Sequence, residues 1–365
     1  MAASPARIWP ALLALLLLAP ACNLTQLTPS SQVIRPRVAA IEAEPAEIGL
    51  GETTTLSSLL VYPEHPGPEL GQIWFACLEA GGASGCLGLD FASFVTGEEG
   101  DDDDSAAVPE EIDPRDLQFG IGEAFTYTAH GSLVEEAWLA TEPEDRAEGL
   151  TVLVSVNYVH ASNAELGVLL GELIAAVTTG DQETLERVGQ EFADLLGGGI
   201  NAARRVVISD KSAGQPDPGS CPVQELLPNQ NPRLDDLTLH LEEGDAGFAL
   251  GEVTFVHPGE TLLLRPGLIE GSVEDYLYID LDDVTSCREE HPYFAWLTNG
   301  GSIGSDYTFV ADAEDLEEVV GRPKLNSLHL PSAEQFGDRI DLWVVVRDRR
   351  GGMTWRSWVF LPLDE

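Results

Sequence analysis

Hydrophobic and polar residues alternate along several short segments of this chain, and the segments occur in the same order in its two halves. Each half has a strand after a Gly-Glu-Thr turn, then a strand with tryptophan, then a run rich in β-branched residues. The corresponding pairs are 51–56 and 259–264, 73–77 and 293–297, and 150–158 and 340–347. Period-two alternation between turns rich in Gly, Pro and Asp is typical of strands. The pattern predicts an all-β protein with two β-sandwiches.

The first half departs from this repeat after its late strand. Residues 163–177 and 181–196 both have helical periodicity. In the second of these segments the apolar residues fall on one face, and they are Leu185, Val188, Phe192, Leu195 and Leu196. Asp181 is suited to cap a helix, and the glycines at 197–199 are suited to end one.

We therefore expect a helical hairpin over 163–197, inserted before a final strand at 204–209. Its inner face is expected to pack on the sandwich and its outer face to be polar. The alternative is a hairpin that presents an apolar groove to a partner.

The last two strands of the second half are predicted most clearly. Residues 341–347 form a strand pattern, 348–352 a turn, and 353–361 a return strand with three aromatic residues. This segment resembles the last hairpin of bacterial immunoglobulin-like and PKD-like domains, which often read Val-x-Val-x-Asp-x-x-Gly. The resemblance implies two immunoglobulin-like β-sandwich domains, at 35–210 and 231–365.

Two polar segments are expected outside the sandwiches. Residues 97–116 contain a run of seven residues in which six are acidic, and such a like-charge block is expected to be a solvated loop. Residues 211–230 contain four prolines and are expected to link the two domains.

The charge of the chain excludes binding to nucleic acid through charge and disfavours binding to an anionic membrane surface through the charge of the protein. It has 62 Asp and Glu against 19 Lys and Arg, a net charge of −43, and only two of the cations are lysines, Lys211 and Lys324. Nucleic-acid binding requires cationic side chains that neutralise phosphates. An anionic membrane surface would likewise repel this chain.

The N-terminus predicts export. Residues 1–21 have a basic residue, Arg7, a short apolar run, and a small-residue cleavage site before Cys22. The segment 18–22 resembles a bacterial lipobox, whose cysteine is lipidated. The resemblance implies a signal peptide at 1–21 and a lipid anchor and tether at 22–34. It also implies placement in the outer membrane of a Gram-negative bacterium, on the periplasmic side or at the surface. The alternative is ordinary secretion, which leaves Cys22 as a free thiol.

The remaining four cysteines suggest disulfides, because exported proteins meet an oxidising compartment. Three pairings are possible. Cys77 and Cys86 flank a Gly-rich turn, so a local bridge is the simplest choice, and Cys221 would then pair with Cys287. Zinc binding is the rival interpretation, but the chain has no Cys-x-x-Cys spacing.

Motifs for calcium and for hydrolysis are present only in part. The acidic runs 101–104 and 280–283 lack the glycine that an EF-hand loop requires at its sixth position. Residues 300–304 match the G-x-S-x-G elbow around Ser302, with Asp312 and His329 following in hydrolase order. A strand pattern at 307–310 follows the motif, however, where a hydrolase has a helix.

The sequence therefore predicts a non-catalytic envelope lipoprotein with a binding, scaffolding or adhesion role. Its expected partners are the lipid bilayer, through acyl chains on Cys22, and an envelope protein or glycan; no cofactor, metal ion or nucleic acid is expected. Two alternatives stay open: a serine hydrolase that uses Ser302, and an adhesin stalk stiffened by calcium.

Overall fold

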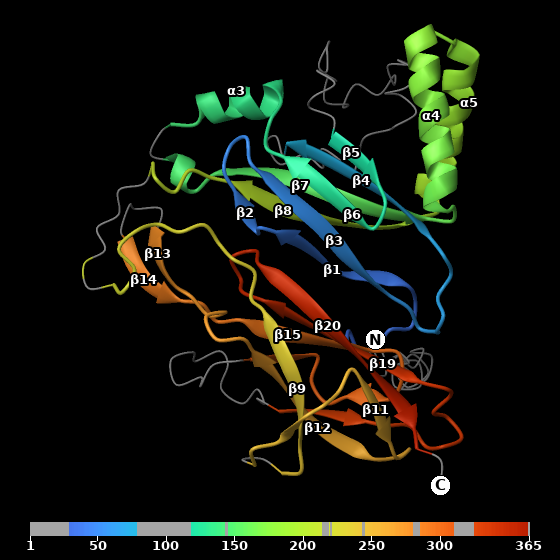
Figure 1. The fold of residues 1–365 in the computed structure, drawn as a ribbon, viewed down its shortest axis with the longest axis vertical. Coiled ribbons are helices and arrows are strands. Elements are labelled where there is room, and N and C mark those ends of the chain that lie inside the picture. The colour runs from blue at the N-terminus through green and yellow to red at the C-terminus, as the bar shows by residue number, and fades with distance from the viewer. Residues whose placement is uncertain are drawn as a thin grey trace, which may run out of the picture.

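The computed structural model describes residues 29–78, 118–142, 145–213, 219, 221–242, 245–279, 285–309 and 325–363. Strands dominate these residues and form two β-sandwiches, which confirms the predicted fold class (Figure 1). The expected acidic loop at 97–116 lies outside the described residues.

The first sandwich contains two antiparallel sheets, apart from one parallel strand at an edge. One sheet has the order β1 (Arg37–Glu44), β3 (Thr53–Val61), β6 (Ala124–Thr128). The other has the order β2 (Glu47–Ile48), β8 (Ile200–Ile208), β7 (Leu150–Val159), β4 (Gly71–Leu78), β5 (Gln118–Ile121), with β2 parallel to β8.

The second sandwich repeats this arrangement. One sheet has the order β10 (Phe248–Ala249), β9 (Leu234–His240), β12 (Thr261–Leu268), β18 (Asn326–His329), β16 (Ser302–Ile303). The other has the order β11 (Val253–Val256), β20 (Met353–Pro362), β19 (Ile340–Arg347), β15 (Tyr293–Thr298), β17 (Tyr307–Phe309). Here β11 is parallel to β20, as β2 is to β8. A separate hairpin, β13 (Asp275–Ile279) and β14 (Thr285–Glu289), is inserted before β15.

Each sandwich is packed around a tryptophan from an interior strand of one sheet, as the repeat predicts. Trp74 on β4 and Trp296 on β15 are 0% and 1% exposed. Both indole N–H groups are satisfied, because Trp74 donates to the carbonyl of Gly122 at 2.8 Å and Trp296 to Thr308 Oγ1 at 2.8 Å. A buried indole needs such a partner to avoid a desolvation penalty.

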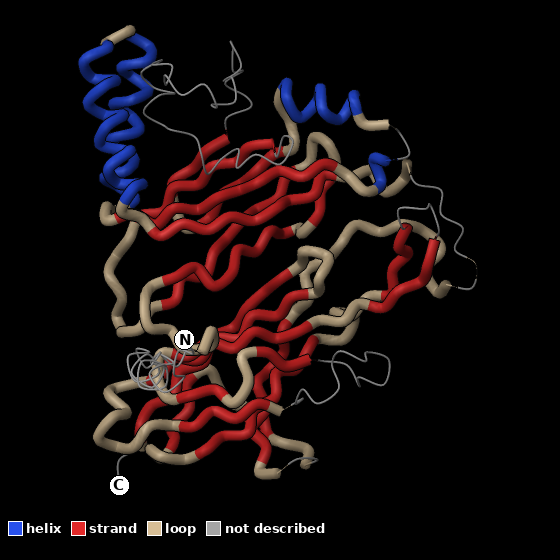
Figure 2. Tube along the Cα trace, turned by 180° about the vertical axis from the view of Figure 1, so that it is seen from behind, coloured by secondary structure: helices blue, strands red, loops and turns tan. Residues whose placement is uncertain are grey.

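The sheet β1–β3–β6 is covered on both of its faces. One face packs on the sheet of β7 and β8, in a core that includes Ile41, Leu56 and Val154. Its other face packs on the sheet of β19 and β20, through Ala40 and Val61 against Val345. The two sandwiches are therefore stacked as four β-layers (Figure 2). A further apolar core lies between the sandwiches, in addition to the core inside each one.

The N-terminal segment differs from the expected tether. Val33 is 2% exposed and lies in the core between the sandwiches. Gln32 forms a parallel bridge with Thr298, and Ser30 and Ser31 both donate to the carboxylate of Asp306. Residues 29–34 are thus attached to the second sandwich, because apolar contact and main-chain pairing are both available there.

The inserted helical hairpin is confirmed as α4 (Asn163–Thr179) and α5 (Gln182–Gly197), and it projects from one end of the first sandwich (Figure 1). Ser162 and Glu165 form a capping box on α4, and Asp181 accepts from the N–H of Thr184 at the start of α5. Two short helices, α3 (Ser132–Ala140) and η2 (Asp145–Ala147), lie between β6 and β7 and were not expected from the sequence.

The expectation of a polar outer face is wrong for α4. Residues of α4 such as Leu166 and Leu173 pack against Val188 and Phe192 of α5 and against the ends of β4 and β7. Val168 and Ile174 on its opposite face are 63% and 54% exposed. The strongly amphipathic helix is α5, whereas α4 is apolar nearly all round.

Candidate functional site

One candidate site is a cleft where the two sandwiches meet. It lies beside the β13–β14 hairpin, which is labelled in Figure 1. Its walls come from segments that are far apart in the sequence: β2, β8, residues 226–229, the β13–β14 hairpin and the turn after β19. The cleft has a volume of about 920 Å³.

Arg204 of β8 ties the sandwiches together at the base of the cleft. Arg204 is 7% exposed, and its guanidinium donates to the carbonyl of Ile41 at 2.5 Å and to that of Gly351 at 2.5 Å. Burial lowers the pKa of Arg204 to about 10, and the carboxylates of Asp348 and Glu42 oppose that shift. The side chain therefore stays charged at neutral pH and joins main chain from both halves.

The turn predicted at 348–352 is organised by the carboxylate of Asp348. It accepts from the N–H groups of Arg350 and Gly352, each at 2.8 Å, and from Asn229 Nδ2 at 3.0 Å. Gly352 is required here, because an added Cβ would lie 2.0 Å from Asp348 Oδ2. Arg349 takes a left-handed φ of 71°, which is uncommon for a residue with a side chain.

Residues 221–230, expected in the linker, are folded against both halves. The predicted bridge between Cys221 and Cys287 is confirmed and attaches this segment to β14. Further along, the N–H of Asn229 donates to Glu47 Oε2 at 2.6 Å, and Lys211 Nζ lies 2.6 Å from Glu47 Oε1. One of the chain's two lysines is thus used at this junction.

The charge of the cleft differs from that of the chain. Its cationic lining residues are Arg204, Arg205, Lys211, Arg288, Arg349 and Arg350. Its acidic lining residues are Glu47, Glu148, Glu289, Glu290 and Asp348. Six cations and five carboxylates leave a formal charge of +1, whereas the chain as a whole carries −43. The cleft therefore concentrates about a third of the chain's 19 Lys and Arg residues.

Arg350 neutralises two carboxylates at the back of the cleft. Its Nη1 lies 2.9 Å from Glu290 Oε1 and 3.4 Å from Glu274 Oε2, and its guanidinium stacks 4.5 Å from the ring centre of Tyr276. Burial and the neighbouring Asp348 carboxylate nevertheless raise the pKa of Glu290 to about 7. Burial also raises the pKa of Asp348. Carboxyl groups with raised pKa values in a cleft are typical of functional sites and also of structural networks.

The open side of the cleft has arginines beside tyrosine rings. The Arg288 guanidinium lies 3.6 Å from the ring centre of Tyr278, which is 37% exposed. Arg349 is exposed, and within the described residues its guanidinium has no hydrogen-bond or ion-pair partner. Guanidinium groups and aromatic faces together are suited to bind carboxylates, phosphates and sugar rings.

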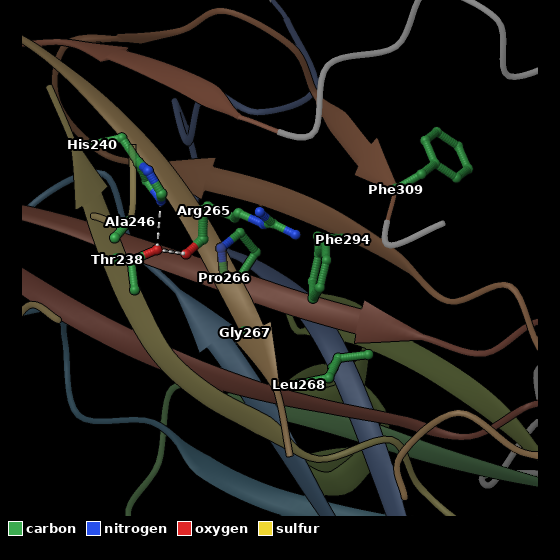
Figure 3. A pocket seen from close by; sticks show the side chains of 9 residues that line it. All are labelled: Thr238, His240, Ala246, Arg265, Pro266, Gly267, Leu268, Phe294 and Phe309. Atoms are coloured by element: carbon green, nitrogen blue, oxygen red, sulfur yellow. Dashed lines mark hydrogen bonds between the residues drawn. The ribbon is translucent and has the colours of Figure 1, made fainter. Parts of the chain in front are cut away.

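A second, smaller pocket of about 290 Å³ lies on the second sandwich beside β9 and β12 (Figure 3). Here Asp245 Oδ1 lies 2.7 Å from His240 Nδ1, and His240 Nε2 lies 2.9 Å from Thr238 Oγ1. Sequence reasoning missed this carboxylate–imidazole–hydroxyl array. The signal was the placement of Thr238 and His240 two residues apart, on one face of a strand.

The array is arranged to hold a loop rather than to attack a substrate. The Thr238 hydroxyl donates to the carbonyl of Arg265 at 2.9 Å, so its proton is not directed at the imidazole. Asp245 accepts from the N–H groups of Leu241, Glu242 and Gly247, and these hydrogen bonds lower its pKa. The carboxylate thereby fixes the turn after β9.

The residues of the G-x-S-x-G motif are not joined as a hydrolase requires. Ser302 on β16 lies opposite His329 on β18, but the His329 ring nitrogens face Thr261 Oγ1 at 2.9 Å and Ser327 Oγ at 3.2 Å. The motif is followed by β17, the strand that the sequence predicts there. Asp312 lies outside the described residues.

Several other predicted site residues also lie outside the described residues: Cys22, Cys86 and the acidic runs at 101–104 and 280–283. Cys77 is on β4, and the pairing of its side chain is not described. In the ranges that are described, His, Cys, Asp and Glu side chains form no group of three or more able to hold a metal ion. No helix in those ranges has the length and apolar content to cross a membrane.

Comparison with known proteins defines no family for the chain. No protein-family model matches it, and no curated protein is significantly similar to it. Among solved structures, red sea bream transglutaminase is similar over 92% of this chain and 32% of its own, with 7% identity and a TM-score of 0.21.

Two other structures are similarly distant. Three N-terminal domains of the Hoc capsid protein of bacteriophage RB49 match 90% of this chain and 59% of theirs, with 8% identity and a TM-score of 0.18. The alpha-2-macroglobulin of E. coli matches 90% of this chain and 17% of its own, with 8% identity and a TM-score of 0.21. The chain thus spans less than two thirds of each of these structures, and likenesses this low carry no functional argument.

Proposed function

We propose that this protein is a non-catalytic cell-envelope lipoprotein that binds the anionic part of a partner molecule in the cleft between its two sandwiches. The observation that carries the proposal is the local charge of the cleft. Six of 19 cationic residues gather in one concave surface of a chain with a net charge of −43. Salt screens charges that are more than about 8 Å apart at physiological ionic strength. An anion inside the cleft would therefore interact mainly with the nearby arginines, and only weakly with the carboxylates elsewhere on the chain.

The contacts of these cations indicate which of them would meet the partner. Arg204 and Arg350 are engaged with main chain and carboxylates at the base of the cleft. Arg349 and Arg288 are exposed at its open side. An Arg guanidinium binds a carboxylate or phosphate through two parallel N–H donors, which gives orientation as well as affinity. The tyrosine beside Arg288 would add contact with a sugar ring or a peptide plane.

Binding can be tested with hexaglutamate as a defined anionic probe and the full chain in about 150 mM salt, the ionic strength at which distant charges are screened. We expect saturable binding by calorimetry, and an at least fivefold loss of affinity when Arg288→Glu and Arg349→Glu are combined. The matched control combines Arg35→Glu with Arg233→Glu, which reverses two exposed cations outside the cleft and gives the same change of −4 in net charge. Equal loss in the control, or no binding at all, would contradict an anion-binding cleft.

The lipid anchor is a separate part of the proposal, supported by the lipobox-like segment that ends at Cys22. Intact mass of the protein purified from membranes, before and after reduction, tests it. We expect a diacyl or triacyl mass on Cys22. An unmodified chain that begins at Cys22 would mean an exported protein with a free thiol.

The non-catalytic role is tested by labelling with a fluorophosphonate, which reacts with activated serines. No labelling of Ser302 is expected, because the His329 ring nitrogens are directed at Thr261 and Ser327. Labelling that is lost in Ser302→Ala would favour a hydrolase.

A further inference from the structure

We propose that the outer face of α4 binds a second copy of this chain around a two-fold axis that passes near Gly171. The face consists of the exposed residues of one stripe along the helix: Ala164, Gly167, Val168, Gly171, Ile174, Ala175 and Thr178. Positions 164, 168, 171, 175 and 178 follow each other at intervals of four and three residues, as do positions 167, 171, 174 and 178, so all seven share one side of the helix. We call them the Gly171 face.

The first argument is the apolar surface that this face exposes. Val168 and Ile174 are 63% and 54% exposed, although the rest of α4 has ample apolar contact with α5 and the sandwich. The Thr178 hydroxyl is satisfied within the helix, where it donates to the carbonyl of Ile174 at 2.7 Å. The Gly171 face therefore presents no side-chain polar group that seeks water, which is unusual for the exposed side of a helix in a soluble domain.

The second argument is that packing within the described part of the chain does not require glycine at either of its two glycine positions. Among the described residues, a Cβ added at Gly167 or Gly171 would meet nothing within 4 Å. Glycine is the least favourable helix residue after proline. Gly71 shows the contrast, because a Cβ there would lie 2.5 Å from the carbonyl oxygen of Ala161. Glycines on an exposed helix face allow the backbone of another helix to approach closely.

The third argument identifies a second copy as the occupant. A two-fold axis places each residue of a face opposite a residue of the same face, so the face must complement itself. In an antiparallel pair centred on Gly171, Gly167 lies opposite Ala175 and Val168 lies opposite Ile174. Small residues thus meet small residues, and β-branched residues meet β-branched residues.

The charge of the chain also favours this face for self-association. Two copies that each carry −43 repel one another over most of their surface. Along α4 the two carboxylates are both engaged: Glu165 in the capping box with Ser162, and Glu172 with Arg187 at 2.5 Å. The hairpin projects from the sandwich, so two hairpins can meet while the acidic bodies stay apart (Figure 2). Association should therefore tighten as salt rises, because salt screens the repulsion and leaves apolar contact intact.

The test is sedimentation velocity on the chain from residue 22 onward, with Cys22→Ser so that no acyl chain contributes. We expect a monomer–dimer equilibrium that strengthens at least threefold between 50 and 500 mM salt (order-of-magnitude choices that span the range of screening lengths). Gly171→Leu should weaken dimerisation at least tenfold while leaving the thermal midpoint unchanged or higher, since a side chain fits there in the monomer. Gln190→Leu, on the exposed face of α5, is the matched control and should leave the dimer unchanged.

A second measurement reports which residues face each other across the dimer, and it does not depend on the Gly171→Leu variant. Under mild oxidation Gly171→Cys should form a covalent dimer, because position 171 faces itself across the axis. Val168→Cys alone should not, but a mixture of Val168→Cys and Ile174→Cys should. A monomer at every salt concentration, or a dimer that Gly171→Leu does not weaken, would overturn the proposal. Cross-linking through Gln190→Cys that equals that through Gly171→Cys would overturn it as well.

Discussion

Replacing Glu290 with glutamine should stabilise the protein at high pH and leave its stability nearly unchanged at low pH. The carboxyl group is buried, with a side chain 1% exposed, and its pKa in the folded protein is raised from 4.5 to about 7. Desolvation is the largest cause, and the Asp348 carboxylate adds to it, while Arg350 opposes both. The folded protein therefore holds a proton that the unfolded chain releases between these two pH values.

The sign and size of the effect follow from this difference. Because the folded state binds more protons, stability is full below about pH 4.5 and falls as pH rises towards 7. A pKa difference of about 2.5 corresponds to about 3 kcal/mol, so we expect an effect on the order of 2 to 3 kcal/mol. Glutamine carries no charge at any of these pH values, so Glu290→Gln avoids the fall in unfolding free energy that Glu290 causes as pH rises. It also keeps an oxygen that can accept from Arg350.

Urea denaturation of the wild type and of Glu290→Gln at several pH values between 5 and 8 measures this effect. We expect the difference in unfolding free energy to be small at pH 5 and to reach about 2 to 3 kcal/mol at pH 8. Glu289→Gln removes the same charge from an exposed neighbouring position and is the matched control. If Glu290→Gln is less stable than the wild type at pH 8, the carboxylate is held ionised by Arg350 and this account of the cleft is refuted.

Three further results are expected. Replacing both Cys221 and Cys287 by serine should lower the unfolding free energy by about 4 kcal/mol in urea, because the bridge spans 66 residues. Asp348→Ala should cost about 2 to 4 kcal/mol by the same assay, since it leaves two N–H groups and an amide without their acceptor. Asp245→Ala should speed amide hydrogen exchange of Leu241, Glu242 and Gly247 at least tenfold, with β19 unchanged, because these three N–H groups and His240 lose their partner.

Local patterns in the sequence were sufficient to predict the sandwiches and the insert. The strand at 340–347 agrees with β19, and the capped segment that begins after Asp181 agrees with α5, because alternation and capping depend on near neighbours. The Cys221–Cys287 bridge followed from the four cysteines that remain after Cys22 is set aside, and from one short local pair among them. These features require no knowledge of how the two halves are placed relative to each other.

The cleft could not be predicted in the same way. Arg204, Asn229, Glu290 and Asp348 are scattered over about 145 residues of sequence, and only the stacking of the sandwiches brings them together. The composition of residues 29–34 and 221–230 is polar with prolines, which is typical of a tether or linker. It therefore gave no sign that these segments pack against the sandwiches. The paired Thr238 and His240, by contrast, stand two residues apart and could have been recognised as neighbours on one strand face.

The apolar face of α4 was predicted only in outline, as the alternative in which the hairpin presents an apolar groove to a partner, and for a different reason. The hairpin was expected to follow the usual rule that a helix is polar where it faces water, and α5 does so. In α4 the glycines and alanines between the larger residues weaken any periodic signal, so the exposed stripe has no distinct pattern. Its significance becomes visible only when the structure shows which side of α4 contacts α5.

The most direct test of the central claim, a partner bound in the cleft, is photo-cross-linking in the cells that produce the protein. Arg349→p-benzoylphenylalanine places the cross-linker at the open side of the cleft, and Arg35→p-benzoylphenylalanine places it on an exposed surface elsewhere. We expect one discrete adduct from position 349 and none from position 35, with the adduct reduced when Arg288→Glu is added. No adduct from position 349, or the same adduct from both positions, would contradict binding in the cleft.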